Sequence, residues 1–383
     1  MKKFSFFLSC AASAMFAIAL TSCEAVKDNP SGGDPSKQAI EIKAGDELAG
    51  IIDQLAATAG DEIVVEIPAG IEVLSGTIDT PAGKKVTIVS DANNPATIVM
   101  TNTIYCANAI NVKNVYIDAK NLTSNVFAFT KKNADETLKN EKGQYQVPGD
   151  AFVLDNVIVD SIPSGLVYDG GASYVLEKAV INNCILHFVP SKSGVSAIYL
   201  NSSCSGVADF NVTNTTAYST GDYQLQYFIK FNNSFRADRI GYDDQSASCK
   251  YNIQNNTFYN LVSGNFANHT GLQRYVAFTV KNNIFSFSAN LNQIIRNICG
   301  NKTSFSANDI KNYFIETEFD SNSYVWNGEF KTQNFTAANV NNVEIDPQFK
   351  DPEKGNFRPT NFEFLNLKDI PGDPRWTQWV IKK

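Results

Sequence analysis

Short stretches of alternating apolar and polar residues, several ending in a pair of asparagines, recur along this chain. The clearest is Tyr251–Phe287, which reads YNIQNNTFYN, then a connecting segment, then YVAFTVKNNIFSF. A period of two predicts strands and puts Tyr251 and Ile253 on one strand face. Asparagine tolerates the left-handed backbone conformation, so each pair predicts a bend. We expect Phe258 and Phe285, which follow the bends, to point inward.

The same unit is found at other asparagines. Apolar residues stand two positions after Asn156, Asn183, Asn233 and Asn322, at Ile158, Ile185, Phe235 and Tyr324. Other apolar residues stand three positions before the asparagines, at Val153, Val180, Ile253, Val280 and Phe319. Before Asn233, the charged residue Lys230 takes this position instead. Irregular repeats of a few tens of residues, built of strand and turn, favour a solenoid whose bends stack asparagines in an amide ladder. A β-sandwich, whose strands also alternate, is the alternative.

The segment before these units predicts a cap. A short strand (AIEI) precedes an amphipathic helix over Asp46–Ala59, with Asp46 as N-cap and Gly60 after its end. Three strand segments follow: IVVEIPAGI, GTIDTPAGKKVTIVSD and ATIVMTN. A helix over the first coil protects its open edge from pairing with other chains. The fold class we predict is all-β, a parallel β-helix with a short N-terminal capping helix.

Several polar stretches lack the alternation. Asp118–Asp150 predicts a long loop that leaves the coil, which in a compact domain is often functional or simply solvated. Arg236–Cys249, Val262–Tyr275 and Asn290–Glu316 predict further excursions. Near the C-terminus, we expect Trp376 and Trp379 to cap the last coil, with sugar stacking as the alternative.

The N-terminus predicts export. A basic start is followed by an apolar stretch too short for a comfortable membrane span, and Leu20-Thr21-Ser22-Cys23 resembles the bacterial lipoprotein signal. The resemblance implies cleavage before Cys23 and lipidation of that residue. We therefore divide the chain into a signal peptide (1–22), a flexible tether (23–38), a cap with the first coils and a long loop (39–150), and the remaining coils with a C-terminal cap (151–383).

Composition excludes some functions. The net charge is −7 and charged residues are sparse, which argues against a nucleic-acid binder. Cys106, Cys184, Cys204, Cys249 and Cys299 show no CxxC spacing, so we predict no metal site and expect most of them in the coil interior. One or two disulfides remain open. With only His187 and His269, a histidine-centred triad is poorly supported.

Both ends of the predicted coil region resemble a known family. The stretch DEIVVEIPAG followed by KKVTIVSD resembles the opening of right-handed parallel β-helix proteins of the pectate-lyase-like superfamily. The tail IDPQFKDP with GNFR is similar to the close of many secreted β-helices. Together with the lipoprotein signal, the chain is similar to Bacteroidota cell-surface lipoproteins of unknown function. The resemblance implies a right-handed pectate-lyase-like solenoid and leaves the activity open, because this superfamily includes lyases, hydrolases, esterases and adhesins.

The resemblance also directs attention to candidate chemistry. Lyases of the superfamily use an Arg or Lys base and a cation or Ca²⁺ that neutralises a uronate carboxylate. The candidate catalytic residues are Lys230, Arg239, Arg274 and Lys281, and the candidate binding residues are Tyr227, Arg236, Asp238, Tyr242, Asp243 and Asp244. Solvated loop charges are the simpler interpretation of each. The Gly-His-Gly of the polygalacturonases and the lyase tryptophan-isoleucine-Asp-His signature are absent.

These observations lead to three alternative functions. We expect a lipid-anchored protein of the outer-membrane surface that binds or helps process polysaccharide, including pectin-like or other uronate-containing glycans, beside glycan-import proteins. A polysaccharide lyase or glycoside hydrolase is the first alternative, and an adhesin-like structural protein is the second. We expect no cofactor, with Ca²⁺ left open, and no nucleic-acid partner.

Overall fold

The computed structural model describes residues 40–232, 249–263, 266–268, 276–286, 314–320, 323–325 and 345–378. The chain divides into two compact units, Met1–Ile40 and Glu41–Lys383, and all the described helices and strands belong to the second. The predicted signal peptide, Cys23 and the tether lie outside the described residues. No helix in the described part is long and apolar enough to cross a membrane.

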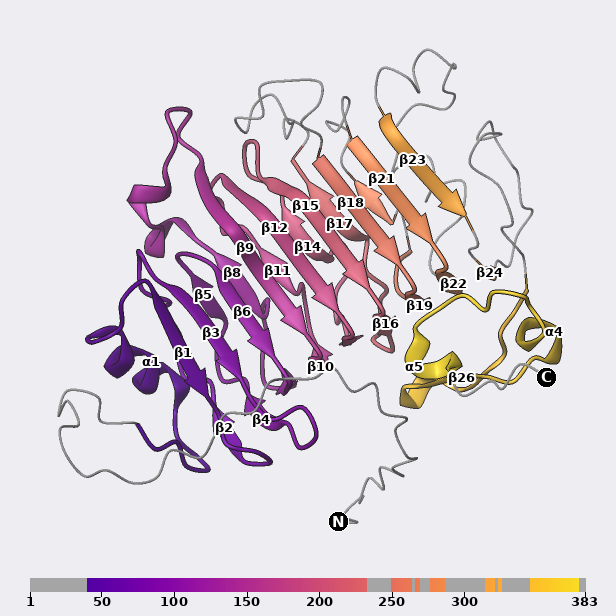
Figure 1. Cartoon of the computed structure of the whole chain (residues 1–383), viewed down its shortest axis with the longest axis horizontal. Helices are drawn as coiled ribbons and strands as arrows, with labels where there is room; N and C mark the ends of the chain where they lie inside the picture. The colour runs from indigo at the N-terminus through magenta and orange to yellow at the C-terminus, as the bar shows by residue number, and fades with distance from the viewer. Residues whose placement is uncertain are drawn as a thin grey trace, which may run out of the picture. The chain divides into compact units, whose positions relative to one another are not determined.

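Three parallel sheets make up most of this unit (Figure 1). Sheet 1 contains, in spatial order, β1 (Glu62–Glu66), β3 (Lys85–Val89), β6 (Ile110–Lys113), β9 (Tyr145–Asp155), β12 (Tyr174–Asn182), β15 (Gly206–Thr213), β18 (Cys249–Gln254), β21 (Val276–Lys281) and β23 (Phe314–Asp320). Sheet 2 contains β2 (Glu72–Leu74), β4 (Ala96–Val99), β7 (Val115–Asp118), β10 (Ile158–Ile162), β13 (Ile185–Phe188), β16 (Thr216–Ser219), β19 (Thr257–Tyr259), β22 (Ile284–Ser286) and β24 (Ser323–Val325). Sheet 3 contains β5 (Ile104–Cys106), β8 (Phe127–Phe129), β11 (Val167–Tyr168), β14 (Ser196–Leu200), β17 (Tyr227–Phe231) and β20 (Ala267–Asn268).

From β3 to β21 the chain visits the sheets in the order 1, 2, 3 and then returns to sheet 1, beside its previous strand there. Each strand thus pairs in parallel with its counterparts one circuit earlier and one circuit later, as β12 does with β9 and β15. The prediction of an all-β chain with few helices is confirmed, and the parallel sheets are consistent with a β-helix. A β-sandwich, whose sheets are antiparallel, does not fit these ladders.

Aromatic side chains fill the space between the sheets. Phe127, Phe152, Phe188, Phe210, Phe228, Phe258 and Phe285 are all buried. Phe258 stacks on Phe285 with ring centroids 5.2 Å apart, and Phe228 lies 5.5 Å from Phe258. Burying each such ring stabilises the fold by about 1.5–3 kcal/mol, so the core forms only when successive circuits stack.

Asparagines at the bends between sheets 1 and 2 form the predicted ladder. Asn114, Asn156, Asn183, Asn214, Asn255 and Asn282 all have φ between 51° and 56°. The Asn156 amide donates to Asn114 Oδ1 at 2.9 Å, and the Asn183 amide donates to Asn156 Oδ1 at 3.0 Å. Further along, Asn255 donates to Asn214, and Asn282 donates to Asn255.

The predicted alignment of the units was wrong by one residue in part of the chain. The prediction had aligned Asn156 and Asn183 with the second residues of the pairs Asn255-Asn256 and Asn282-Asn283. In the structure, they take the positions of Asn255 and Asn282, the first residues of these pairs. Consequently Val153 and Val180 lie in one outward row of sheet 1 with Asn211 and Asn252, whereas Ile253 and Val280 face the core. A one-residue shift in a strand exchanges its two faces, which is why Ile158 is 36% exposed and Phe258 is buried.

Other predicted boundaries also changed. Lys230 belongs to β17 of sheet 3 and not to sheet 1 with Ile253 and Val280, while Asn233 and Phe235 of that predicted unit lie outside the described residues. Ile40–Ile42 is not a strand, and the helix α1 (Leu48–Ala56) begins after Glu47, while Asp46 accepts a hydrogen bond from the Lys43 amide. Asp118–Asp150 is not a continuous loop, because it contains β8, the 3-10 helices η1 (Lys131–Asn133) and η2 (Glu136–Leu138), and the start of β9.

The capping helix itself is confirmed as an element of the first circuit. Leu48, Ile51 and Ile52 of α1 are buried, and the Ala49 amide donates to the Ser75 carbonyl beyond β2. Glu47 forms a bridge with Leu74 of β2, the edge strand of sheet 2.

A C-terminal segment, residues 345–378, lies near β16 and β19 (Figure 1), and its side chains pack against the outer face of sheet 2. It contains the antiparallel pair β25 (Phe349–Asp351) and β26 (Asn356–Pro359), the 3-10 helix η4 (Pro352–Lys354) between them, and the short helices α4 (Phe362–Leu365) and α5 (Pro374–Thr377). Phe357 contacts Tyr218 and Tyr259, with ring centroids 4.9 and 5.7 Å away.

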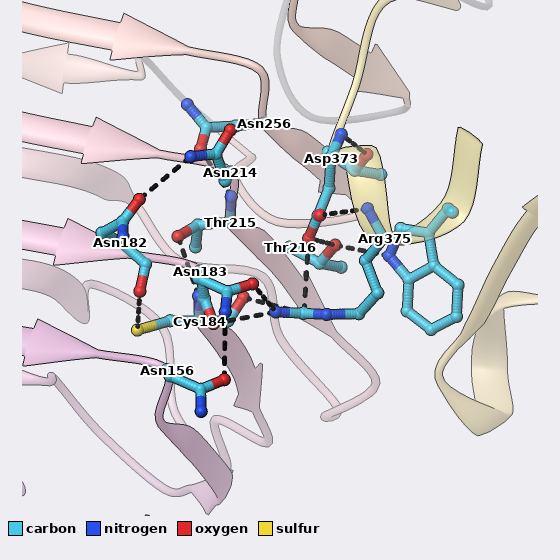
Figure 2. Close-up of polar contacts among 12 residues, drawn as sticks. Asn156, Asn182, Asn183, Cys184, Asn214, Thr215, Thr216, Asn256, Asp373 and Arg375 are labelled. Atoms are coloured by element: carbon cyan, nitrogen blue, oxygen red, sulfur yellow. Dashed lines mark hydrogen bonds and ion pairs between the residues drawn. The ribbon is translucent and has the colours of Figure 1, made fainter. Parts of the chain in front are cut away.

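The tip of this segment reaches the asparagine ladder (Figure 2). Arg375 Nη2 donates to both the carbonyl oxygen and Oδ1 of Asn183 at 2.8 Å. Asp373 accepts a hydrogen bond from Thr216 Oγ1 at 2.8 Å, and its own amide donates to Thr257 Oγ1 at 3.0 Å. Trp376, expected to cap the last coil, instead donates from Nε1 to Thr216 Oγ1 at 2.7 Å.

Candidate functional site

The outer face of sheet 1 holds a row of alternating charges. Strand register places Asp150 of β9 beside Lys178 of β12, Lys178 beside Asp209 of β15, and Asp209 beside Lys250 of β18. These positions point outward because they lie one residue away from buried Ala179, Phe210 and Tyr251. The sequence alternation therefore directs the charges outward, and the register across four circuits brings them together.

Hydrogen bonds hold the charged side chains in place. Lys178 Nζ lies 2.9 Å from Asp150 Oδ1, and Asn211 Nδ2 donates to Asp209 Oδ1 at 2.7 Å. The hydrogen bond to Asp150 raises the pKa of Lys178, partial burial opposes that change, and the charges of Asp150 and Asp209 add to it. Lys178 is therefore a fixed ammonium group at neutral pH.

A second polar row runs parallel to the first, nearer the bends. Asn182 Nδ2 donates to Asp155 Oδ1 at 2.8 Å, and Thr213 Oγ1 donates to Asn182 Oδ1 at 2.8 Å. Between the two rows lies a third row with Val153 and Val180. Together the three rows line an open depression of about 580 Å³, the sheet 1 groove, formed by Asp150, Val153, Asp155, Lys178, Val180, Asn182, Asp209, Asn211, Thr213 and Asn252.

A neighbouring depression extends the groove. It has a volume of about 480 Å³ and shares Asp150, Lys178 and Asp209 with the groove, while adding Glu177 and Lys250. The groove itself is lined by three carboxylates and one ammonium group. Its surface is consequently rich in hydrogen-bond donors and acceptors and negative in balance.

Only some predicted site residues fall in the described part of the chain. Tyr227 and Lys230 lie together on β17 of sheet 3, where Lys230 Nζ is 5.6 Å from the Tyr227 ring centroid. Lys281 ends β21 of sheet 1 and is in register with Gln254. Since Lys230 and Lys281 belong to different sheets, they do not share one groove. Arg236, Asp238, Arg239, Tyr242, Asp243, Asp244 and Arg274 lie outside the described residues, and their roles stay predictions.

A polar cluster that the sequence did not predict surrounds His187 on the outer face of sheet 2. His187 Nδ1 lies 2.6 Å from Asp160 Oδ1, and Nε2 lies 2.6 Å from Thr220 Oγ1. Tyr116 donates to Asp160 Oδ2 at 2.9 Å, and the His187 ring stacks on Tyr218 at 4.4 Å. Burial alone would raise the pKa of Asp160, but hydrogen bonds from His187 and Tyr116 outweigh it and lower the pKa.

The His187 cluster could not be found from spacing in the sequence, because Asp160 and Thr220 come from other circuits. Tyr218, which stacks on His187, also contacts Phe357 of the C-terminal segment. The cluster therefore lies beside the part of sheet 2 that the C-terminal segment contacts. Its arrangement fits a structural role in supporting Tyr218.

Two of the described cysteines, Cys106 and Cys184, lie in the coil interior, as expected. Cys106 and Cys184 are buried free thiols. Burial raises the pKa of both, that of Cys184 to about 12, so neither is a ready nucleophile at neutral pH. Across the described ranges, no group of three or more His, Cys, Asp and Glu side chains is arranged to hold a metal ion. Ca²⁺ binding therefore stays an untested prediction.

Two family models match parts of the chain. Residues 70–220 are similar to a domain of unknown function, DUF4957. Residues 251–376 are similar to another domain of unknown function, DUF5123. No curated protein matches the chain.

The two regions are continuous in the structure. Strand β15 of the DUF4957 region pairs with β18, most of which belongs to the DUF5123 region. Arg375 of the DUF5123 region donates to Asn183 of the DUF4957 region. The sheet 1 groove, lined mainly by the DUF4957 region, also includes Asn252 of the DUF5123 region. The candidate site is thus shared between the two matched regions.

Proposed function

We propose that this protein binds a polysaccharide chain in the sheet 1 groove. The observation that carries the proposal is the regular succession of side-chain amides, carboxylates, hydroxyls and ammonium groups across four neighbouring strands. Neighbouring strands lie about 4.8 Å apart, a repeat close to the length of one pyranose unit, so successive strands can bond successive sugars. The open shape of the groove suits a polymer that enters and leaves at both ends.

The charge of the groove favours a neutral glycan over a uronate. Of the residues that line the depression of about 580 Å³, Lys178 is the one ammonium group and is already paired with Asp150, while Asp155 and Asp209 add negative charge; Lys250, beside Asp209, lines only the neighbouring depression. A polyuronate would meet these carboxylates as like charges, unless Ca²⁺ bridged them. Hydroxyl groups, by contrast, can donate to the carboxylates and accept from the Asn211 and Lys178 nitrogens.

One observation supports a glycoside hydrolase as a second candidate. Asp150 and Asp209 lie two strands apart, which corresponds to about 9.6 Å between their backbones at the usual strand spacing. This backbone spacing is at the upper end of the separation of about 6.5–9.5 Å between the carboxyl groups of an inverting glycosidase. Lys178, which stands between the two aspartates and binds Asp150, would have to move aside for the attacking water. The lyase alternative named Lys230, Arg239, Arg274 and Lys281 as candidate bases; Lys230 and Lys281 lie on different sheets, and Arg239 and Arg274 lie outside the described residues.

The test uses the soluble chain that begins after Cys23. Affinity electrophoresis and calorimetry against galactan, xylan and polygalacturonate, with and without Ca²⁺, measure binding. We expect neutral polysaccharide to bind and Asn211→Ala to weaken binding at least tenfold, with exposed Asp222→Asn as the matched control outside the groove. Equal binding by Asn211→Ala and the wild type contradicts the groove proposal.

The same samples decide between binding and catalysis. Release of reducing ends that is lost in Asp209→Asn, while binding is retained, establishes a hydrolase. New ultraviolet absorbance from unsaturated uronides establishes a lyase. Absence of binding to any glycan supports the adhesin-like or structural alternative.

We also propose that the three sheets wind as a right-handed parallel β-helix of the pectate-lyase-like type. The support is the repeated order of sheets, together with the strong preference for right-handed crossovers between parallel strands. The resemblance of the opening and closing motifs points the same way.

Lipid anchoring at the outer-membrane surface is proposed from the N-terminal sequence. Lipidation of Cys23 would place the β-sheets at the cell surface, where polysaccharide and glycan-import proteins are the partners we expect. Palmitate labelling of the expressed full chain, lost in Cys23→Ala, tests the anchor. Labelling that persists in Cys23→Ala contradicts it.

A further inference from the structure

A column of aromatic rings lies on the outer face of sheet 3, away from the sheet 1 groove. Register places Tyr168 of β11 beside Tyr199 of β14, and Tyr199 beside Lys230 of β17. The Tyr168 and Tyr199 ring centroids are 5.6 Å apart. Lys230 Nζ lies 4.9 Å from the Tyr199 centroid and 5.6 Å from that of Tyr227.

These side chains face outward from a well-packed sheet. Their strand neighbours Val167, Ile198 and Ile229 are buried, whereas Tyr168, Tyr199, Tyr227 and Lys230 are each partly exposed. We call these four residues the tyrosine platform. Three phenol rings exposed on successive strands need a reason, because the core gains little from them.

The charge of the platform differs from that of the groove. Among the described residues, no carboxylate lies within ion-pair distance of Lys230, whose ammonium group instead rests over two tyrosine rings. The nearest acidic neighbour in sequence to Tyr168, Asp169, is buried and accepts a hydrogen bond from the Ser202 amide at 2.6 Å. Lys178 in the groove, by contrast, is paired with Asp150.

Polar atoms surround the rings. Asn201 Nδ2 donates to the Tyr199 hydroxyl oxygen at 3.2 Å, which leaves the Tyr199 hydroxyl hydrogen available to donate. Ring faces pack against the C–H face of a pyranose, and hydroxyls bond its hydroxyls. The Lys230 ammonium group, which has no carboxylate partner in the described part of the chain, attracts an anion. These features together suit one sugar unit that carries a negative charge.

We propose that the tyrosine platform is a second glycan-binding site, specific for an anionic pyranose unit that bears a carboxylate or a sulfate. The proposal is independent of the sheet 1 groove, which we assign to neutral sugars. A chain with both sites can hold a polysaccharide of mixed composition by two contacts, each weak alone, with a gain in avidity.

The test compares matched trisaccharides on the soluble chain by calorimetry: tri-galacturonate, its methyl ester, which lacks only the charges, and a 6-sulfated galactose trisaccharide. We expect an anionic trisaccharide to bind at least tenfold more tightly than the ester. Lys230→Met, which keeps the aliphatic stem, and Tyr199→Ala should each weaken that binding at least tenfold. Lys192→Met, on the exposed turn before β14, is the charge-matched control, and thermal melting checks that each variant is folded.

The outcomes separate the two sites. Lys230-dependent binding of the uronate alone supports the proposal with a carboxylate ligand, and Lys230-dependent binding of the sulfated sugar supports it with a sulfate. Unchanged affinity in folded Lys230→Met, or failure of both anions to bind, overturns it. Loss of uronate binding in Asn211→Ala but not in Lys230→Met also overturns it, because the acidic sugar would then occupy the groove.

Discussion

Arg375 donates hydrogen bonds of 2.8 Å to both oxygens of Asn183, a residue 192 positions earlier in the chain. This contact occupies Asn183 Oδ1, which in a regular ladder would accept from the Asn214 amide. Asn214 instead donates to Asn182 Oδ1 at 3.0 Å. The C-terminal segment is therefore inserted into the side-chain ladder itself, and it is fixed to sheet 2 at the middle of the stack.

Removing the Arg375 guanidinium should destabilise the folded chain. Arg375→Ala leaves Asp373, which is 1% exposed, without its ionic partner and removes both hydrogen bonds to Asn183. We expect a loss of about 3 kcal/mol in the free energy of unfolding, as for other partly buried ion pairs that lose one member. Urea denaturation measures it, with the exposed Lys350→Ala in the same segment as control.

Arg375→Ala should also release the C-terminal segment from sheet 2 before the sheets unfold. Gly372 has φ of 105° and lies so close to Ile284 that a Cβ atom there would be 2.5 Å from Ile284 Cδ1. Gly372→Ala should therefore also loosen the segment. Limited proteolysis followed by mass spectrometry should show faster cleavage after Lys350 or Lys354 in both variants, and resistance equal to that of the wild type would disprove the docking role.

The asparagine ladder makes a prediction that separates backbone strain from hydrogen bonding. Asn156 has φ of 55° and bonds both Asn114 and Asn183. Asn156→Ala loses these bonds and adds left-handed strain of about 1–2 kcal/mol. Asn156→Gly loses only the bonds, each worth about 1 kcal/mol. Thermal melting should rank the stabilities as wild type, then glycine, then alanine, and equal values for the two variants would rule out the strain argument.

Separating the two matched regions should leave neither folded. A chain of residues 40–232 exposes the edges of β15, β16 and β17 and uncovers buried Phe210 and Phe228. Unpaired strand edges and apolar surface favour aggregation. Size-exclusion chromatography should show aggregates for this fragment and a single species for residues 40–383. A monomeric fragment that unfolds cooperatively would show that the DUF4957 region is an independent domain.

The His187 cluster predicts a dependence of stability on acid pH. Hydrogen bonds from His187 and Tyr116 outweigh burial and lower the pKa of Asp160 in the folded state. The stabilisation from Asp160 is therefore complete above its unfolded pKa of about 3.9 and is lost as the pH falls through the lower folded value. Asp160→Asn should flatten the fall of melting temperature below that pH, with Asp222→Asn as control, and an unchanged profile would contradict the assignment.

Much of the fold could be predicted from the sequence, because it depends on local chemistry. Period-two alternation specified strands, and asparagine at the bends specified left-handed backbone, as the φ values of Asn255 and Asn282 confirm. The helix α1 was predicted as an amphipathic helix, and Leu48, Ile51 and Ile52 form its buried face. Each of these signals lies within a few residues and needs no knowledge of distant partners.

The positions of functional side chains required the tertiary structure. The sequence pattern aligned Val153 and Val180 with Ile253 and Val280, which face the core, but the register between circuits places them between the polar rows of the sheet 1 groove. Successive circuits differ in length, so the sequence alone cannot say which residue meets which, and a shift of one residue exchanges the two faces of a strand.

The sequence by itself therefore determined the strands, their bends and the stacking of circuits, since alternation and left-handed asparagine act locally. Only the tertiary structure decided that Asp150, Lys178 and Asp209 share a groove, that Tyr199 lies beneath Lys230, and that Arg375 enters the ladder at Asn183. The physical reason is that each of these contacts joins residues from different circuits or from the chain end, and their pairing is fixed by the sum of all ladder hydrogen bonds and core contacts rather than by any local pattern.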